Sequence, residues 1–208
     1  MALKLYGAPL SPYVRSVRIA FIEKGLDYEF VPMGLADLQE QEYEQLHPFR
    51  KVPALGINGQ SLYETSAIMR YIDEAHANEV KLQPSDPLER SYCEQWLSVG
   101  NSYLYRTAFT GFFFQKVLAP KFGMPSDNAL MLASAEKMRR YIKIIATALS
   151  KGELGKNPQP MLSDILVSAI LAPLQTIEQG REILAMDTSV VNWINSLVKR
   201  RSFISTAK

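Results

Sequence analysis

Hydrophobic and polar residues alternate in short runs at the start of the chain, a pattern typical of β-strands. Residues 3–6 form the first such run, and a turn follows at residues 7–9. Ser11 and Pro12 then supply a helix N-cap and a proline at the first helical position, and apolar residues continue the helix to a glycine stop at Gly25. A second strand over residues 27–32 completes a predicted β-α-β unit.

The next stretch predicts a hairpin that leads directly into a helix. Residues 37–48 are polar, and we expect them to be irregular or weakly helical. Strand-like runs at 54–57 and 61–63 flank Asn58-Gly59, a pair that favours a tight hairpin turn. With a helix from about residue 65 to 76, the order predicts a compact sheet-and-helix domain over residues 1–77.

From residue 88 onward the hydrophobic period is helical, with no convincing strand. A polar stretch marked by prolines, residues 78–87, suits a linker. The predicted helices cover residues 88–118, 127–150, 163–178 and 188–200. We therefore expect a second, all-helical domain over residues 88–208.

Composition narrows the class of protein. The chain has 208 residues, 47% hydrophobic and 21% charged, which is ordinary for a globular protein, and its net charge of +2 is too small to argue for nucleic acid. The single cysteine, Cys93, excludes an internal disulfide and fits a reducing compartment, and no apolar run is long enough for a membrane helix. His47 and His76 lack acidic or thiol partners at metal-ligand spacing, so we expect a cytoplasmic protein without a metal.

The hairpin-to-helix stretch is a candidate binding site. A helix that opens at Glu64-Thr65 offers N–H groups and a positive dipole end to an anion, and Glu64 adds an acceptor for a neighbouring cation. Pro53 can expose the backbone of Val52 to a peptide-like ligand. A zwitterionic small peptide would suit both features, but a hairpin joined to a helix for stability alone explains the stretch equally well.

Ser11 is the candidate reactive hydroxyl. As an N-cap it would bond its own helix, yet the same position allows it to face a ligand. The run Ser11-Pro12-Tyr13-Val14 parallels the Cys-Pro-Tyr-Cys of glutaredoxins, but both cysteines are absent, which disfavours thiol-disulfide exchange. A hydroxyl there can still stabilise a thiolate that the ligand brings.

Together these features resemble a cytosolic glutathione transferase over the whole chain. The resemblance is carried by Val52-Pro53, the acidic-hydroxyl pair in residues 64–68 and the helical second half. It implies a thioredoxin-like α/β N-terminal domain and an all-α helical-bundle C-terminal domain. The run Tyr6…Ser11-Pro12…Arg15 is similar to the serine-type members, of the theta and phi sort.

The resemblance also implies roles for individual residues. Ser11 would hold the glutathione sulfur, Lys51 and the Val52 backbone the glycyl and cysteinyl parts, and Glu64 with Thr65 the γ-glutamyl end.

Three positions qualify this assignment. Tyr6 is the rival hydroxyl, because a first-strand tyrosine has this task in other branches of the family. Leu38 and Gln39 stand where a basic pair is frequent; Gln39 can still bond the glycyl carboxylate, but we expect weaker affinity for glutathione.

An aromatic stretch is the candidate site for the second substrate. Tyr105, Phe109 and Phe113 recur every four residues and would share one helix face. They are core or subunit-interface residues on one interpretation, and an apolar pocket with Leu10 on the other. Phe113 matches best by position in the phi-like pattern.

The resulting hypothesis is a detoxifying enzyme that conjugates glutathione to hydrophobic electrophiles. The resemblance implies a homodimer, with glutathione as co-substrate and no other cofactor. A binding or regulatory protein on the same scaffold, and a glutathione-dependent isomerase or peroxidase, remain alternatives.

Overall fold

The computed structural model describes residues 3–76 and 80–207. These residues group into two compact units, one from residues 1–83 together with 200–208 and the other from residues 84–199. The predicted domain limits, 1–77, 78–87 and 88–208, stay a prediction, and their positions 1–2, 77–79 and 208 lie outside the described residues. As packing units, the last residues of the chain go with the first unit.

The first unit is built on a mixed sheet with four strands in the order β2-β1-β3-β4. β1 and β2 run parallel, whereas β3 pairs antiparallel with both β1 and β4. The strands predicted from alternation are confirmed as β1 (Leu3–Gly7), β2 (Glu29–Pro32), β3 (Ala54–Ile57) and β4 (Gln60–Tyr63). Asn58 and Gly59 have φ values of 49° and 84°, which a tight hairpin turn between twisted strands requires.

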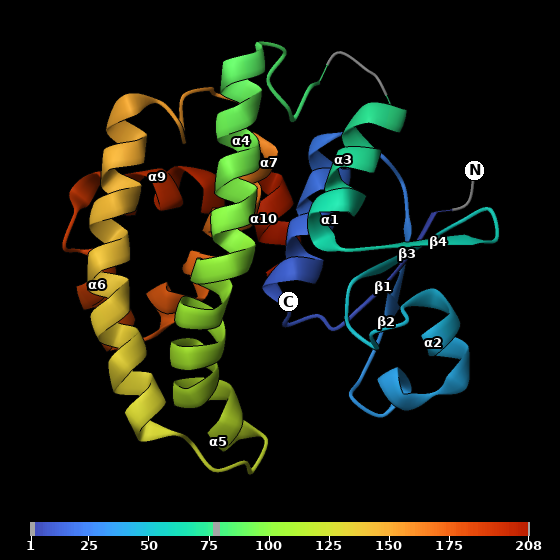
Figure 1. Cartoon of the computed structure of the whole chain (residues 1–208), viewed down its shortest axis with the longest axis horizontal. Coiled ribbons are helices and arrows are strands. Elements are labelled where there is room, and N and C mark those ends of the chain that lie inside the picture. Colours follow the sequence, from blue (N-terminus) through green and yellow to red (C-terminus); the bar gives the residue numbers. More distant parts are fainter. Residues whose placement is uncertain (1–2, 77–79, 208) are drawn as a thin grey trace. The chain divides into compact units, whose positions relative to one another are not determined.

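Two helices cover one face of this sheet (Figure 1). The helices of the first unit are α1 (Pro12–Glu23), the 3-10 turn η1 (Asp37–Gln39), α2 (Gln41–Leu46), α3 (Thr65–Ala75) and α10 (Arg201–Ser205). α1 and α3 pack against each other, and α2 lies beside β3 and β4. The weakly helical stretch expected at 37–48 is thus two short helices, whereas α10 was not predicted.

Gly7 explains how closely α1 approaches the end of β1. A Cβ atom at Gly7 would lie 2.5 Å from a methyl group of Val14, so only glycine leaves room for the helix. Leu5, two residues earlier on the same strand face, is fully buried and pairs with the equally buried Leu55 of β3. This apolar layer fixes the start of α1 above the carboxyl end of β1.

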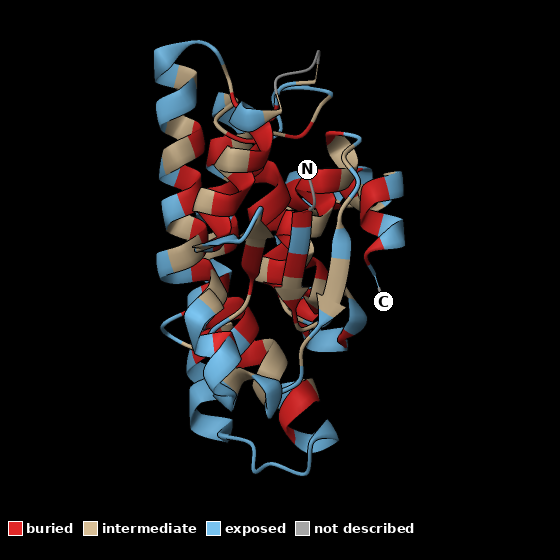
Figure 2. Ribbon diagram, turned by 90° about the vertical axis from the view of Figure 1, so that its right-hand side faces the viewer, coloured by how far each residue is buried: buried red, intermediate tan, exposed pale blue. Residues whose placement is uncertain are grey.

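The second unit is helical, and its described residues contain no strand, as predicted. Its helices are α4 (Pro87–Val99), the π-helical continuation η2 (Gly100–Leu118), α5 (Ala119–Lys121), α6 (Asn128–Lys151), α7 (Leu162–Leu171), the 3-10 turn η3 (Ala172–Thr176), α8 (Glu178–Leu184) and α9 (Thr188–Val198). Every residue of α7 is buried, so this helix belongs to the core of the unit. In Figure 2, buried segments lie inside and exposed residues follow the outer sides of the helices. None of the described helices is long and apolar enough to cross a membrane.

The single helix predicted over residues 163–178 is wrong. Pro173 has no N–H for the helical ladder, so the α-helix ends at Leu171 and a 3-10 turn follows. Gly180, which follows the predicted range, lies inside α8, where an added Cβ would stand 2.2 Å from the carbonyl oxygen of Leu174. The glycine therefore serves close packing between α8 and η3.

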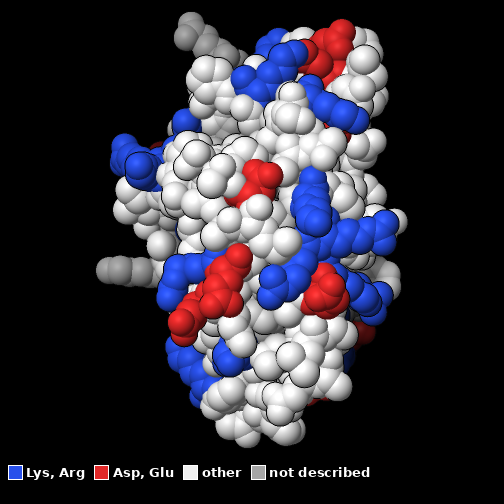
Figure 3. All heavy atoms as spheres, turned by 90° about the vertical axis from the view of Figure 1, so that its left-hand side faces the viewer, with Lys and Arg blue, Asp and Glu red and all other residues white. Residues whose placement is uncertain are grey.

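Charged side chains of both signs are mixed on the surface. On the face in Figure 3, groups of Lys and Arg side chains have Asp and Glu among them. This agrees with the small net charge of +2.

Candidate active site

Ser11 occupies the turn between β1 and α1 and is the N-cap of the helix. Its hydroxyl accepts a hydrogen bond from the main-chain N–H of Val14 at 3.4 Å, a long and weak contact. No acceptor among the described residues takes the hydroxyl proton of Ser11. One oxygen can therefore cap the helix and still donate to a thiolate, so the two interpretations of Ser11 are compatible.

The side chain of Tyr6 points to the face of the sheet opposite α1. Successive side chains of a strand point to opposite faces, and its neighbours Leu5 and Gly7 face α1. The ring of Tyr6 instead lies across β3, because a Cβ atom at Gly56 would be 3.4 Å from its ring edge. This geometry favours Ser11 over Tyr6 as the hydroxyl at the start of α1.

The loop before β3 presents its main chain at the predicted peptide-binding position. The Val52-Pro53 bond is cis. The buried Tyr43 of α2 donates its hydroxyl to the carbonyl oxygen of Lys51 at 2.5 Å, and burial raises the pKa of Tyr43 to about 12, so this donor stays protonated. The N–H and C=O of Val52 form no hydrogen bond with any described residue, which leaves both for a ligand strand. The side chain of Lys51 is exposed.

His47 anchors the same loop. It is 2% exposed, its Nδ1 atom accepts from the N–H of Phe49 at 3.3 Å, and its ring lies 4.9 Å from that of Tyr63. Burial lowers the pKa of His47, with the Glu64 carboxylate acting in the opposite direction. The side chain of His47 therefore lies in the interior of the loop.

Arg50 was not singled out in the sequence, although it precedes Lys51. Its φ is 51°, and its guanidinium donates to Glu44 Oε2 at 2.8 Å and to Gln39 Oε1 at 3.3 Å. The structure therefore brings together Gln39, predicted to bond the glycyl carboxylate, and a cation from the loop. The adjacent Lys51 could have drawn attention to this position.

Glu64 and Thr65 lie where β4 meets α3. Glu64 has a φ of 73° and does not cap α3 with its side chain, while Thr65 is 5% exposed at the first helical position. A non-glycine residue with this φ costs roughly 1–3 kcal/mol and is most frequent at binding sites. The start of α3 thus keeps the dipole and carboxylate predicted to recognise the γ-glutamyl end.

The aromatic residues predicted to share a helix face do so. The ring centroids of Tyr105 and Phe109 are 5.3 Å apart, and those of Phe109 and Phe113 are 5.6 Å apart, with both pairs stacked. Phe109 is buried, and its two neighbours are half-buried. Leu10 belongs to the other unit and is 50% exposed.

Comparison with known proteins decides the family. Residues 5–80 match the model of the glutathione S-transferase N-terminal domain. Glutathione S-transferase 3 from Zea mays is 30% identical over 98% of this chain and 92% of its own length. The chain belongs to the glutathione S-transferase family. The crystal structure of glutathione transferase F7 from Populus trichocarpa is 27% identical, with a TM-score of 0.87 over 99% of this chain and 98% of that one.

A further similar structure is a complex with a glutathione conjugate. Glutathione S-transferase I from maize, in complex with an atrazine glutathione conjugate, is 26% identical with a TM-score of 0.86, over 100% of this chain and 97% of that one. As a glutathione S-transferase, the chain uses glutathione as a co-substrate and no other cofactor. Among the described residues, no cluster of His, Cys, Asp and Glu side chains could hold a metal ion.

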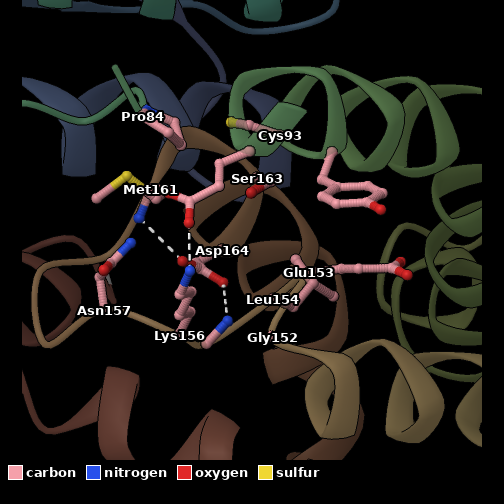
Figure 4. A pocket seen from close by; sticks show the side chains of 13 residues that line it. Pro84, Cys93, Gly152, Glu153, Leu154, Lys156, Asn157, Met161, Ser163 and Asp164 are labelled. Carbon is pink, nitrogen blue, oxygen red and sulfur yellow. Dashed lines mark hydrogen bonds and ion pairs between the residues drawn. The ribbon is translucent and has the colours of Figure 1, made fainter. Parts of the chain in front are cut away.

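A small hollow in the helical unit of this glutathione S-transferase is lined by none of the predicted site residues (Figure 4). Its volume is about 20 Å³, room for about one water molecule. Asp164 accepts there from the N–H groups of Gly155 at 2.8 Å and Met161 at 2.9 Å, and burial raises its pKa. Cys93, also on the wall, is 2% exposed and burial raises its thiol pKa, as expected for a packed cysteine.

Proposed function

We propose that this enzyme conjugates the glutathione thiolate to hydrophobic electrophiles and that Ser11 stabilises the thiolate. The observation that carries the proposal is the Ser11 hydroxyl at the start of α1, which accepts from its own helix and retains a proton to donate. The relatives named glutathione S-transferase, and the maize enzyme with its glutathione conjugate, support the reaction.

The energies suffice without a base or a metal. Lowering the pKa of a free thiol from about 8.5 by roughly two units requires about 2.7 kcal/mol in favour of the thiolate. A hydrogen bond from Ser11 to a charged sulfur contributes about 1.5–3 kcal/mol, and the N-terminus of α1 about 0.3–1 kcal/mol. The thiolate then attacks the electrophile, and the protein supplies proximity.

The remaining contacts to glutathione follow from the same proposal. The main chain of Val52 would pair with the cysteinyl part, Lys51 and Gln39 would hold the glycyl end, and Glu64 with Thr65 the γ-glutamyl end. The unpaired main chain of Val52 and the uncapped start of α3 support these assignments.

On the electrophile side, we propose that the stack of Tyr105, Phe109 and Phe113, with Leu10, offers an apolar surface. Domain limits at residues 77 and 88, a homodimer and a cytoplasmic location complete the proposal. The single cysteine supports that location, and the family resemblance supports the dimer.

The deciding experiment compares Ser11→Ala with Tyr6→Phe. Each removes one hydroxyl near the end of β1, which makes the pair a matched control. We expect Ser11→Ala to lower kcat/KM for an aryl halide by about tenfold to a hundredfold and to raise the pKa of the bound thiol, read from thiolate absorbance. For Tyr6→Phe, kcat/KM should stay within about threefold of the wild type, because removing a hydroxyl that does not contact the sulfur costs at most a few tenths of a kcal/mol.

Loss of the α1 cap must be separated from loss of chemistry, since an N-cap substitution by alanine costs about 1 kcal/mol of stability. Circular dichroism and the thermal midpoint of each variant provide that separation. Conjugation that survives Ser11→Ala and disappears in Tyr6→Phe would overturn the assignment of Ser11. A wild type that binds no glutathione would refute the enzyme proposal itself.

A further inference from the structure

Arg50 holds a long cationic side chain at a position where the backbone favours glycine. Its φ of 51° lies in the left-handed region, which non-glycine residues rarely adopt. A glycine would take this conformation without steric cost. The main chain alone therefore gives no reason for an arginine here, and the reason must lie in what the guanidinium does.

Two hydrogen bonds hold the guanidinium of Arg50 in place and leave some of its N–H donors for a ligand. Glu44 takes one N–H from Nη2 at 2.8 Å, and Gln39 takes one from Nη1 at 3.3 Å. A guanidinium has five N–H donors in a planar fork, so three are not used by these two bonds. The Arg50 side chain is 38% exposed, which leaves it open to a ligand.

The bond to Gln39 also orients a second donor. Because Oε1 of Gln39 accepts from Arg50, the amide places its NH₂ group away from that contact, available to an incoming acceptor. A planar cation and an amide donor then stand side by side. A carboxylate has two oxygens that match such a pair, and arginine binds carboxylates with two parallel hydrogen bonds.

We propose that Arg50, with Gln39, binds the glycyl carboxylate of glutathione and supplies the positive charge that Gln39 lacks. The inference rests on the proposed function, since it concerns the same bound glutathione. Glu44 pairs with the same guanidinium but takes no part in the proposed contact with glutathione. The competing interpretation is that Arg50 only closes the loop by pairing with Glu44, an exposed ion pair of little energetic value.

The test measures binding by calorimetry for two ligands, glutathione and its glycyl ethyl ester, which lacks the charged carboxylate. We expect the wild type to bind glutathione about tenfold more tightly than the ester. Arg50→Gln and Arg50→Gly should bind glutathione about tenfold more weakly than the wild type and lose most of the preference for glutathione over the ester, with Lys51 accounting for what remains. Arg50→Gly suits the backbone at this φ, so its fold should be retained.

Two control variants separate charge from structure. Lys4→Gln removes an exposed cation that pairs with Glu29 in the same unit, and it should keep the tenfold preference. Glu44→Gln removes the partner of Arg50 and should bind glutathione within about threefold of the wild type, because the guanidinium itself remains.

The remaining outcomes would contradict either the role of Arg50 or the proposed function. A preference for glutathione that persists undiminished in both Arg50 variants would overturn the role of Arg50 and leave the proposed function intact. The same holds if the wild type does not distinguish the ligands, or if Glu44→Gln reproduces the loss seen in the Arg50 variants. A wild type that binds neither ligand would refute the proposed function, and this inference with it.

Discussion

At the scale of single residues, His47 shows how a buried ring prepares a loop for binding. The ring of His47 accepts a hydrogen bond from the N–H of Phe49, and the main-chain carbonyl oxygen of His47 accepts one from the N–H of Arg50 at 2.8 Å. These bonds hold the main chain immediately before Lys51 and Val52. Burial disfavours the charged imidazole and lowers the pKa of His47, which links the loop to pH.

We expect the stability of the protein to decrease when the pH falls below about 6.5, in part because of His47. Burial lowers the pKa of His47 in the folded state. Between that lowered value and about 6.5, the unfolded chain binds a proton that the folded chain does not, so stability rises with pH at up to about 1.4 kcal/mol per pH unit. Above about 6.5 this contribution is fully present. Urea unfolding at several pH values from about 4.5 to about 8, on both sides of 6.5, measures how the free energy of unfolding depends on pH.

The variant for this prediction is His47→Asn, which keeps a side-chain acceptor near Phe49. It should lower stability most above about pH 6.5 and progressively less as the pH falls, because it removes the part of the slope due to His47. His76→Asn is the matched control and should keep the wild-type slope, since His47 is still present. Equal pH dependence in wild type and His47→Asn would contradict the prediction.

At the scale of elements, the sequence predicts what local chemistry decides. The Ser-Pro start of α1, the Asn-Gly turn and the strand alternation all have local causes, and these elements are confirmed. α8 was missed because Gly180 is a helix breaker by propensity, and only its contact with Leu174 explains its use. α10 was missed because five residues carry too little periodicity to read.

The start of α7 differs from the other helix starts in its burial. Asp164 lies within the first turn and is 2% exposed, and its two oxygens accept the N–H groups of Gly155 and Met161. Met161 stands at the N-cap position and forms no cap bond with its side chain, whereas its main-chain N–H donates to Asp164. The carboxylate of Asp164 therefore joins the chain before α7 to the helix itself.

Asp164→Ala should destabilise the protein by about 3 kcal/mol, because both hydrogen bonds to the buried Asp164 carboxyl group are lost at once. The comparison variant is Asp187→Ala, which removes an exposed N-cap that accepts from Ser189 at 2.9 Å and should cost about 1 kcal/mol. Denaturation midpoints in urea report both. Equal costs for the two variants would show that burial adds nothing to the cap of α7.

At the scale of the whole molecule, local patterns mark several candidate site residues in the sequence but do not predict the charged contacts around them. Ser11, Val52 and Glu64 sit at element boundaries that local patterns mark. Arg50 could not be assigned, because its contacts with Gln39 and Glu44 depend on how η1, α2 and the loop fold back on one another. Long-range side-chain contacts of this kind have no local signature, and the same is true of the chain's return to the first unit.

That return is fastened to α1 by two arginines. Arg200 binds Glu23 with two bonds of 2.7 Å, and the hydroxyl of Ser202 donates to the same carboxylate. Arg15 donates to the carbonyl oxygen of Phe203 at 3.1 Å and lies over its ring. Because Arg15 is on the turn that follows Ser11, α10 stabilises the helix that carries the predicted catalytic hydroxyl.

Breaking this link should destabilise the protein by more than a surface ion pair would. The Glu23 side chain is 8% exposed and that of Arg200 30%, so Arg200→Ala removes two charge-assisted hydrogen bonds from a largely buried carboxylate and should cost about 2 kcal/mol. Removing both partners should cost less than the sum of the two single changes, which a double-mutant cycle by urea unfolding measures. Glu29→Ala, which breaks the exposed pair with Lys4, should cost less than 1 kcal/mol, as is typical of surface pairs. If Arg200→Ala costs no more than Glu29→Ala, or if the two single changes are additive, the attachment of α10 rests on the apolar contact of Phe203 and not on charge.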